Sequence, residues 1–262
     1  MSLPFIQNNS SLSLNQDGSP VFVTPVNKTV QILDKNQSVI RKLPTELPAP
    51  AVAGTISNNR MIVAASSTDN KVRLWDWNSP SSESFRELNG FKREVTALAF
   101  SRDDNYLAAG SEDEQVKIWD LQKKDTDRPI FDENLPGNVY SVVFSPDGKY
   151  LAAGDNHNNV YFYEISTREK KGVTLEMPGN VVALSWIEYQ GQTLLAAAGD
   201  EVVRLWTVDQ AGNATPFGRP LIHEKDVITL ALSQNGEFLY VAAKDEQLYR
   251  WNVQAVKDSV VK

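Results

Sequence analysis

Few residues of this chain have the types and spacing that catalysis requires. The 262 residues include no cysteine and two histidines, which excludes thiolate nucleophiles, disulfides and cysteine-based metal sites. His157 falls in a predicted turn and His223 at a predicted strand end, and neither has a catalytic partner at a recognisable spacing. We therefore expect a structural hydrogen bond for His223 and an exposed turn position for His157. No glycine-rich phosphate loop and no His-Glu-x-x-His motif occurs.

One stretch, residues 155–159, has the oxygen-rich composition of a calcium-binding loop. A loop of the EF-hand type also needs a glycine at its sixth position and an acid at its twelfth. Val160 and Ser166 stand at those two positions. We interpret the stretch as a turn.

The strands that must position these residues are predicted from an internal sequence repeat. Five aromatic residues end short apolar-rich runs, at steps of 44, 44, 43 and 45 residues. An apolar residue stands 19 positions before each aromatic, except Trp206, where it stands 20 before and implies an insertion in the intervening turn. The same template fits Leu33, 19 residues after Leu14, so there are six copies of one structural unit. The aromatic anchors are Trp75, Trp119, Tyr163, Trp206 and Trp251.

Each copy predicts three strands, because short apolar runs alternate with polar turns such as Ser-Pro-Asp-Gly at residues 145–148. The third strand carries the aromatic anchor. The three-strand cores are residues 9–34, 51–76, 95–120, 139–164, 181–207 and 227–252. Segments between the copies supply a fourth strand at residues 39–43, 84–88, 129–135, 172–177 and 220–223.

This pattern resembles the WD40 repeats of the β-propeller family. The resemblance is carried by the Trp-Asp pairs at 75–76 and 119–120, by the turn at 145–148, and by an aspartate six residues before the aromatic. It implies an all-β fold in which residues 1–262 form a single propeller of four-stranded antiparallel blades. Six copies favour six blades; the alternative is part of a seven-bladed ring. The turn aspartates are Asp69, Asp113, Asp200 and Asp245.

The chain departs from the family in its hydrogen-bonded His–Ser–Asp–Trp network. The histidine position holds apolar residues such as Phe91 and Leu135 in most copies and a histidine, His223, in one. Asn27 and His157 replace the turn aspartate in two copies. We expect apolar packing to replace the network in most blades.

A propeller protects its sheet edges by joining its first and last blades. Five outer strands are available for six copies, so the last copy needs one more. Residues 3–6 and residues 253–261 are the two candidates. We favour the N-terminal segment and expect the polar C-terminal tail to be a frayed end.

The first strands of a propeller line its axis, where catalytic groups would stand. None of the six contains an acid, a histidine or a lysine, so the channel offers little acid–base or metal chemistry. We expect no enzyme activity, no cofactor and no small-molecule substrate. These strands are predicted at residues 9–14, 51–56, 95–100, 139–144, 181–186 and 227–232.

Polar residues precede five of these six strands and would ring one mouth of the channel. Their oxygens suit Ca²⁺, although such residues are also common where a loop enters a strand. The resemblance instead implies protein or peptide binding here, with Tyr140 and Arg93 as anchors, since aromatic and arginine side chains dominate interface energetics. The polar residues are Asn8, Glu94, Asn138, Asn180 and Asp226. The predicted partner-binding face is Arg93, Glu94, Asn138, Tyr140, Asn180, Lys225 and Asp226.

The charge balance limits the classes of partner. The chain has 26 basic and 33 acidic residues, a formal net charge of −7, which opposes general affinity for nucleic acid or anionic membranes. No apolar run approaches the roughly 18 residues of a membrane span, and the N-terminus lacks the pattern of a secretion signal. We therefore expect a cytoplasmic protein–protein interaction scaffold. The alternatives are a sensor or regulatory propeller of a larger signalling protein, and a calcium-binding or enzymatic propeller.

Overall fold

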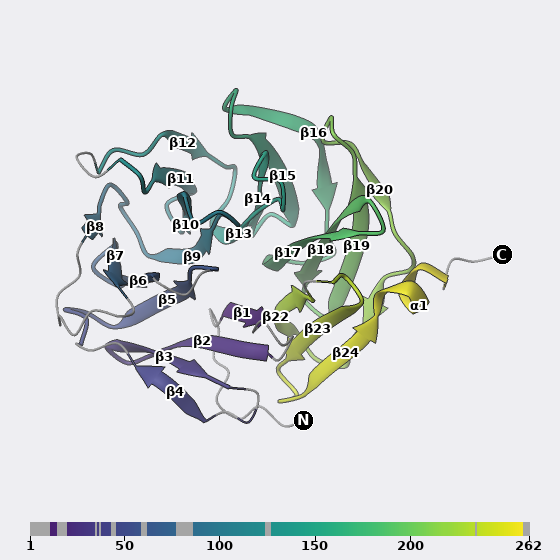
Figure 1. The fold of residues 1–262 in the computed structure, drawn as a ribbon, viewed down its shortest axis with the longest axis horizontal. Coiled ribbons are helices and arrows are strands. Elements are labelled where there is room, and N and C mark those ends of the chain that lie inside the picture. The colour runs from purple at the N-terminus through teal and green to yellow at the C-terminus, as the bar shows by residue number, and fades with distance from the viewer. Residues whose placement is uncertain are drawn as a thin grey trace.

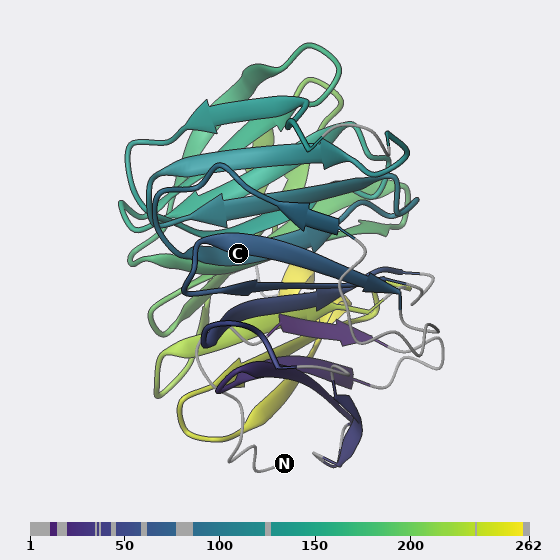
Figure 2. The ribbon, with the colours of Figure 1, turned by 90° about the vertical axis from the view of Figure 1, so that its left-hand side faces the viewer.

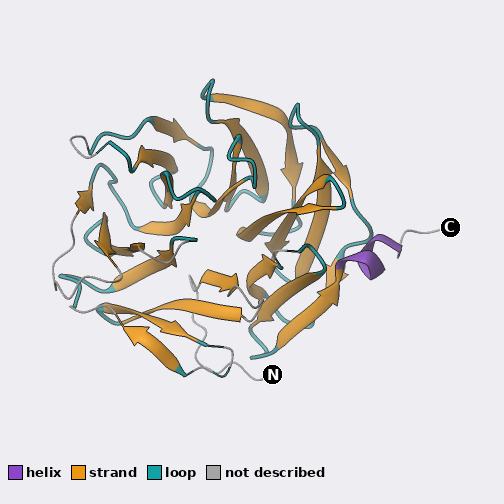
Figure 3. Cartoon of the chain, viewed as in Figure 1, coloured by secondary structure: helices purple, strands orange, loops and turns teal. Residues whose placement is uncertain are grey.

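Apolar residues alternate with tight polar turns along the chain, and the product is a series of antiparallel hairpins. The structure is a computed structural model that describes residues 11–14, 20–34, 36, 38–42, 46–58, 62–76, 86–123, 127–233 and 235–258. In this part of the chain the strands far outnumber the single short helix (Figure 3). No helix in the described ranges is long and apolar enough to span a membrane.

Six antiparallel sheets of the described residues form a ring around a common axis (Figure 1). The innermost strands are β1 (Ser11–Leu14), β5 (Ala51–Ile56), β9 (Val95–Phe100), β13 (Val139–Phe144), β17 (Val181–Tyr189) and β22 (Val227–Leu232). The second strands are β2 (Pro20–Val26), β6 (Ile62–Ser67), β10 (Tyr106–Ser111), β14 (Tyr150–Asp155), β18 (Gln192–Gly199) and β23 (Phe238–Ala243). The third strands are β3 (Thr29–Leu33), β7 (Lys71–Asp76), β11 (Gln115–Asp120), β15 (Asn159–Glu164), β19 (Val202–Val208) and β24 (Leu248–Asn252). The outer strands are β4 (Val39–Lys42), β8 (Arg86–Leu88), β12 (Phe131–Asn134), β16 (Glu169–Glu176), β20 (Ala214–Pro216) and β21 (Leu221–Ile222).

The blade count differs from the expectation. Four sheets have four strands, and the sheet that begins at β17 has five because both β20 and β21 pair with β19. The sheet of β22, β23 and β24 has three strands among the described residues. The prediction of an all-β propeller of four-stranded antiparallel blades is confirmed, and among the described residues the complete blades number five rather than six or seven.

Neither candidate supplies a fourth strand to the last sheet within the described residues. The favoured closing strand, residues 3–6, lies outside the described residues. The other candidate segment is helical: α1 (Val253–Asp258) follows β24 directly. The prediction of a frayed C-terminal tail is therefore wrong for residues 253–258, because Val253 and Val256 are buried.

Strand register explains why the aromatic anchors recur. In one blade Phe100 pairs with Leu107, which pairs with Trp119, so three apolar residues stand in a row across the sheet. In the first copy Leu33 pairs with Phe22 and Phe22 with Leu12. The anchor predicted there, Leu14, is thus two residues off. Leu12 and Phe22 are ten positions apart where Phe100 and Leu107 are seven, and Phe22 and Leu33 are eleven apart where Leu107 and Trp119 are twelve. A shift of two keeps the same face of the strand.

The insertion inferred in the Trp206 copy lies in a longer first hairpin. Strand β17 extends to Tyr189 and β18 begins at Gln192, with only Gln190 and Gly191 between them. Both have positive φ, 50° and 74°, as a type I′ hairpin requires. The additional length therefore extends the strands rather than the turn.

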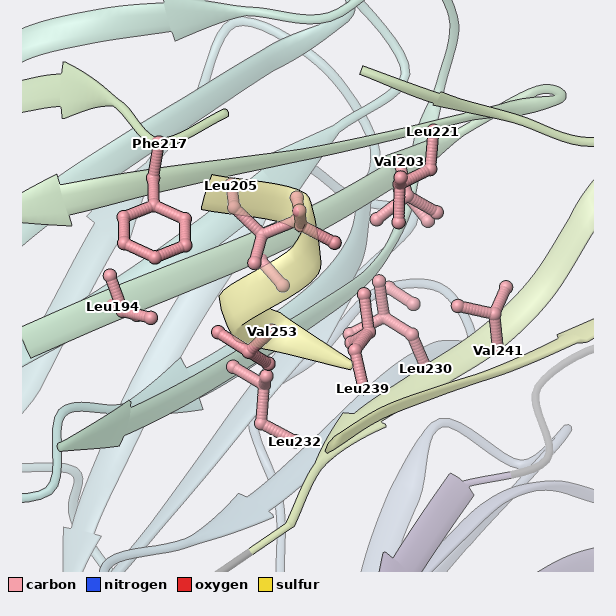
Figure 4. Packing of buried hydrophobic residues seen from close by; sticks show 14 of the residues in the cluster. Leu194, Val203, Leu205, Phe217, Leu221, Leu230, Leu232, Leu239, Val241 and Val253 are labelled. Carbon is pink, nitrogen blue, oxygen red and sulfur yellow. The ribbon is translucent and has the colours of Figure 1, made fainter. Parts of the chain in front are cut away.

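The apolar core lies between neighbouring blades, which stack side by side around the ring (Figure 2). One cluster joins Leu74 and Leu88 of one blade to Leu107 and Trp119 of the next. Another joins the blade of β17 to the three-stranded sheet, and it includes Leu205, Leu239 and Val253 (Figure 4). Each blade is therefore stabilised mainly by its two neighbours.

Candidate partner-binding face at the channel mouth

The inner strands contact one another around the axis and start at the same end of the ring. Strand β9 lies between β5 and β13, β17 lies between β13 and β22, and β1 contacts both β22 and β5. The strands enclose a cavity of about 600 Å³. Its lining contains residues of β5, β9, β13, β17 and β22, which confirms for these five copies the prediction that the first strands line the axis.

Backbone hydrogen bonds fix the residues that precede three of the inner strands. The carbonyl oxygens of Glu94, Asn138 and Asp226 accept the N–H groups of Glu112, Asn156 and Lys244 at 3.0, 3.0 and 2.9 Å. Each bond ties the start of an inner strand to the end of the second strand in the same sheet. The side chains at this end thus project from fixed positions.

Seven polar side chains line the cavity at this end, and we call them the channel mouth. Each lies at or next to the start of a first strand or directly after the end of a second strand. The channel mouth comprises Glu94, Glu112, Tyr140, Asn180, Asp200, Asp226 and Lys244.

The structure brings together four of the seven residues of the predicted partner-binding face. Glu94, Tyr140, Asn180 and Asp226 line the cavity. The other three, Arg93, Asn138 and Lys225, are sequence neighbours that do not belong to the lining. Glu112, Asp200 and Lys244 also line the cavity, although the predicted binding set does not contain them. The register of β23 with β22 brings Lys244 there.

Two ion pairs neutralise part of the acidic charge. Arg93 pairs with Glu112 at 3.3 Å, and the Arg93 side chain is 61% exposed. Lys244 pairs with Asp226 at 2.7 Å. Neither Glu94 nor Asp200 has an ion pair among the described residues. The channel mouth therefore keeps an excess of negative charge.

Deeper in the channel the lining is apolar apart from a few hydroxyl groups. The Thr96 hydroxyl donates to the carbonyl of Val139 on the next inner strand. Ser141 and Thr229 occupy the third position of their strands, line the cavity, and are 8% and 5% exposed. Neither hydroxyl has a hydrogen-bond partner in the ranges that the structure describes. Both hydroxyls therefore face the channel and are available to a ligand there.

Three of the predicted turn aspartates cap the turn that follows them. Asp69, Asp113 and Asp245 accept the N–H two residues further on, at 3.3, 3.2 and 3.0 Å. Asp200 differs, because its carboxylate packs over Gly179, where an added Cβ would overlap it. Only Asp200 of these four lines the channel.

In the copy with His157 another aspartate takes the capping role. The fully buried Asp155 accepts the N–H groups of His157 and Asn159, both at 3.0 Å, and the Tyr161 hydroxyl at 3.1 Å. Its oxygens are therefore occupied, which agrees with a turn rather than a calcium loop. Among the described residues no three acidic or histidine side chains gather closely enough to hold a metal ion.

Apolar packing replaces the family's polar network in the blades, as predicted. The Phe91 ring lies 5.9 Å from the Trp119 ring, and Leu47 packs in one cluster with Trp75. Leu135 shares a cluster with Tyr163, and Met177 shares one with Trp206. In the described residues the indole nitrogens of Trp75 and Trp251 have no hydrogen-bond partner.

His223 does not make the predicted hydrogen bond. Its ring packs edge-on against Tyr249 and Trp251, at 4.8 and 6.0 Å, and both its nitrogens lack partners among the described residues. Burial lowers the pKa of His223, and the nearby Asp245 carboxylate only partly opposes this. The prediction was wrong because the Asp245 carboxylate binds the Tyr249 hydroxyl instead. His157 is exposed, as expected.

Comparisons with known proteins agree with this architecture. Residues 50–76, 82–120 and 130–164 match the family model described as "WD domain, G-beta repeat". A chain in a crystal structure titled "Crystal Structure of Mitotic Checkpoint Complex" is similar, with 25% identity and a TM-score of 0.73. The similarity covers 92% of this chain and 73% of that one. A comparison with curated protein sequences found no match.

Proposed function

Because this chain carries WD40 repeats and folds as a β-propeller, we propose that it is a non-enzymatic scaffold that binds a protein or peptide partner. A propeller fold alone serves many functions, so the proposal depends on the site. The observation that carries it is the channel mouth: a cavity of about 600 Å³ with polar and aromatic side chains on backbone-fixed positions. A fixed surface loses little conformational entropy when a partner binds.

The composition of the face supports a protein or peptide as the partner. Tyr140 is half-buried in the lining, and Arg93, two residues before the neighbouring inner strand β9, is exposed. Aromatic and arginine side chains provide most of the binding energy at protein interfaces. The similar chain belongs to a structure titled as a complex, which is consistent with a role in assembly.

The remaining expectations from the sequence are part of the same proposal. We propose that residues 1–262 form one domain and that the sheet of β22, β23 and β24 is its sixth blade. We also propose a cytoplasmic location, with no cofactor and no nucleic acid or membrane partner. The formal net charge of −7 supports the last point, because both surfaces attract clustered positive charge.

The test compares charge reversal at the two ends of one inner strand. Arg93 precedes β9 at the channel mouth, and the exposed Arg102 follows β9 at the opposite end of the ring. Tagged wild-type protein, Arg93→Glu, Tyr140→Ala and Arg102→Glu are used as bait in lysate of the source organism, and captured proteins are quantified by mass spectrometry. We expect Arg93→Glu and Tyr140→Ala each to lower recovery of the main partner about tenfold, and Arg102→Glu to leave it unchanged.

Equal recovery with all four baits would remove the channel mouth as the binding face. A regulatory propeller within a larger signalling protein would use the same face, and the full reading frame separates that alternative from a scaffold. Calorimetry with Ca²⁺ tests the calcium-binding alternative, since heat of binding that disappears in Asp226→Asn would support it.

A further inference from the structure

We infer that the channel mouth binds a lysine or arginine side chain of the partner, an inference that rests on the proposed function. The partner would present this side chain from a peptide segment lying across the face. Its methylene stem would pass between the carboxylates of the channel mouth, and the cation at its tip would reach the Ser141 and Thr229 hydroxyls just inside the channel.

The charge of the channel mouth is the first observation. Four carboxylates, those of Glu94, Glu112, Asp200 and Asp226, line the cavity against one ammonium group, that of Lys244. Two of these carboxylates are already paired, but no ion pair of the described residues neutralises Glu94 or Asp200. A cleft lined by one sign of charge attracts the opposite charge and speeds its association.

The second observation is independent of charge and concerns two hydroxyl groups deeper in the channel. Ser141 and Thr229 line the channel more than nine-tenths buried, and their hydroxyls have no partner in the described ranges. Thr96, on a neighbouring inner strand, shows the usual alternative, since its hydroxyl is satisfied by the Val139 carbonyl. An ammonium has three donors and a guanidinium five, and both lack acceptors, so they complement free hydroxyl oxygens and carboxylates.

The arrangement of the acids favours an organic cation over a metal ion. No three acidic side chains among the described residues gather closely enough to coordinate a metal. Separated carboxylates above an apolar channel instead suit a cation carried on an apolar stem. Val142, Val182 and Leu230 provide that apolar wall, and lysine and arginine stems pack well on such surfaces.

Tyr140 adds an aromatic face at the same place. Its side chain lines the channel, and its position as the second residue of β13 puts it next to Ser141. A ring beside carboxylates favours a cation over a neutral polar group, because the ring face is electron-rich.

The experiment selects ligands without assuming a sequence. A phage library of random twelve-residue peptides is panned against the whole protein, and the enriched sequences are counted. The strongest peptide is then synthesised, and its affinity is measured by calorimetry, together with versions in which each Lys becomes norleucine or each Arg becomes citrulline. The protein variants are Asp200→Asn and Thr229→Val, with Glu188→Gln as the control because Glu188 is exposed near the opposite end of β17.

We expect lysine or arginine to be enriched at one position, and the neutral replacement there to weaken binding at least tenfold. Asp200→Asn should weaken binding about tenfold and Thr229→Val several-fold, while Glu188→Gln changes nothing and all variants keep the wild-type melting temperature. Peptides that bind through Tyr140 and Arg93 without needing a cation would overturn this inference and leave the proposed function standing. A library that yields no binder at all would count against both.

Discussion

At the scale of single residues, the burial of His223 makes the stability of the fold depend on pH. This residue occupies the position that apolar residues fill in other blades, and it is buried against Tyr249 and Trp251. Burial lowers its pKa below the unfolded value of about 6.5. Below that pH the unfolded chain therefore binds a proton that the folded chain resists, and stability is lost as the pH falls through 6.5 towards the folded pKa.

We predict that His223→Met removes part of the acid sensitivity, because methionine already occupies the equivalent position at Met177. The free energy of unfolding, measured by urea denaturation between about pH 7.5 and pH 5.5, should fall less steeply in the variant. His157→Gln is the control, since His157 is exposed and its replacement should leave the slope unchanged. A wild-type slope in His223→Met would contradict the prediction.

Residue types in the sequence were enough to find the acids at the channel mouth but not the free hydroxyls inside it. Glu94 and Asp226 could be placed at the mouth because each precedes an apolar strand whose position the repeat sets. Ser141 and Thr229 look like other strand residues in the sequence. What separates them from Thr96 is that the Thr96 hydroxyl bonds to the Val139 carbonyl on the neighbouring inner strand, and that contact depends on how two blades pack.

At the scale of elements, each blade depends on contact between its third-strand aromatic and the apolar residue that precedes its own inner strand. Phe91 illustrates this, because its buried ring packs against the fully buried Trp119. We predict that Phe91→Ala lowers the free energy of unfolding by about 3–5 kcal/mol through a cavity beside Trp119. Phe91→Leu should cost less than about 1.5 kcal/mol, since leucine fills this position at Leu47 and Leu135.

Chemical denaturation followed by tryptophan fluorescence measures both variants. Equal losses in Phe91→Ala and Phe91→Leu would mean that the aromatic ring contact, rather than the filled volume, stabilises the blade. A loss below about 1 kcal/mol in Phe91→Ala would show that the blade repacks around the missing ring.

Period and turn chemistry predicted the strands well where the local sequence decides them. The expected inner strands at 51–56, 95–100, 139–144 and 227–232 have the same bounds in the structure. The helix after β24 was missed because six residues are too few for a helical period to stand out. A signal existed: Asn252 accepts the Ala255 N–H at 3.0 Å as an N-cap, and Val253 and Val256 are three apart.

At the scale of the whole molecule, the stability of the ring depends on the packing between neighbouring sheets. Helix α1 lies at the junction between the blade of β17 and the sheet of β22 (Figure 1). The Tyr189 hydroxyl donates to Gln254 at 2.8 Å, and Val253 and Val256 share a cluster with Phe217. The helix therefore connects two neighbouring sheets that the backbone joins only through a loop.

We predict that Val256→Ala lowers the free energy of unfolding by about 1–3 kcal/mol, because it opens space in the cluster that holds the two sheets together. The exposed neighbour provides the control, and Ala255→Ser should change stability by less than about 0.5 kcal/mol. Urea denaturation is followed by far-ultraviolet circular dichroism and by tryptophan fluorescence. If the ring unfolds as one unit, both signals move together to a lower midpoint with an unchanged slope. An early fluorescence change in Val256→Ala, before the loss of strand signal, would instead show that the last sheet separates from a ring that otherwise stays folded.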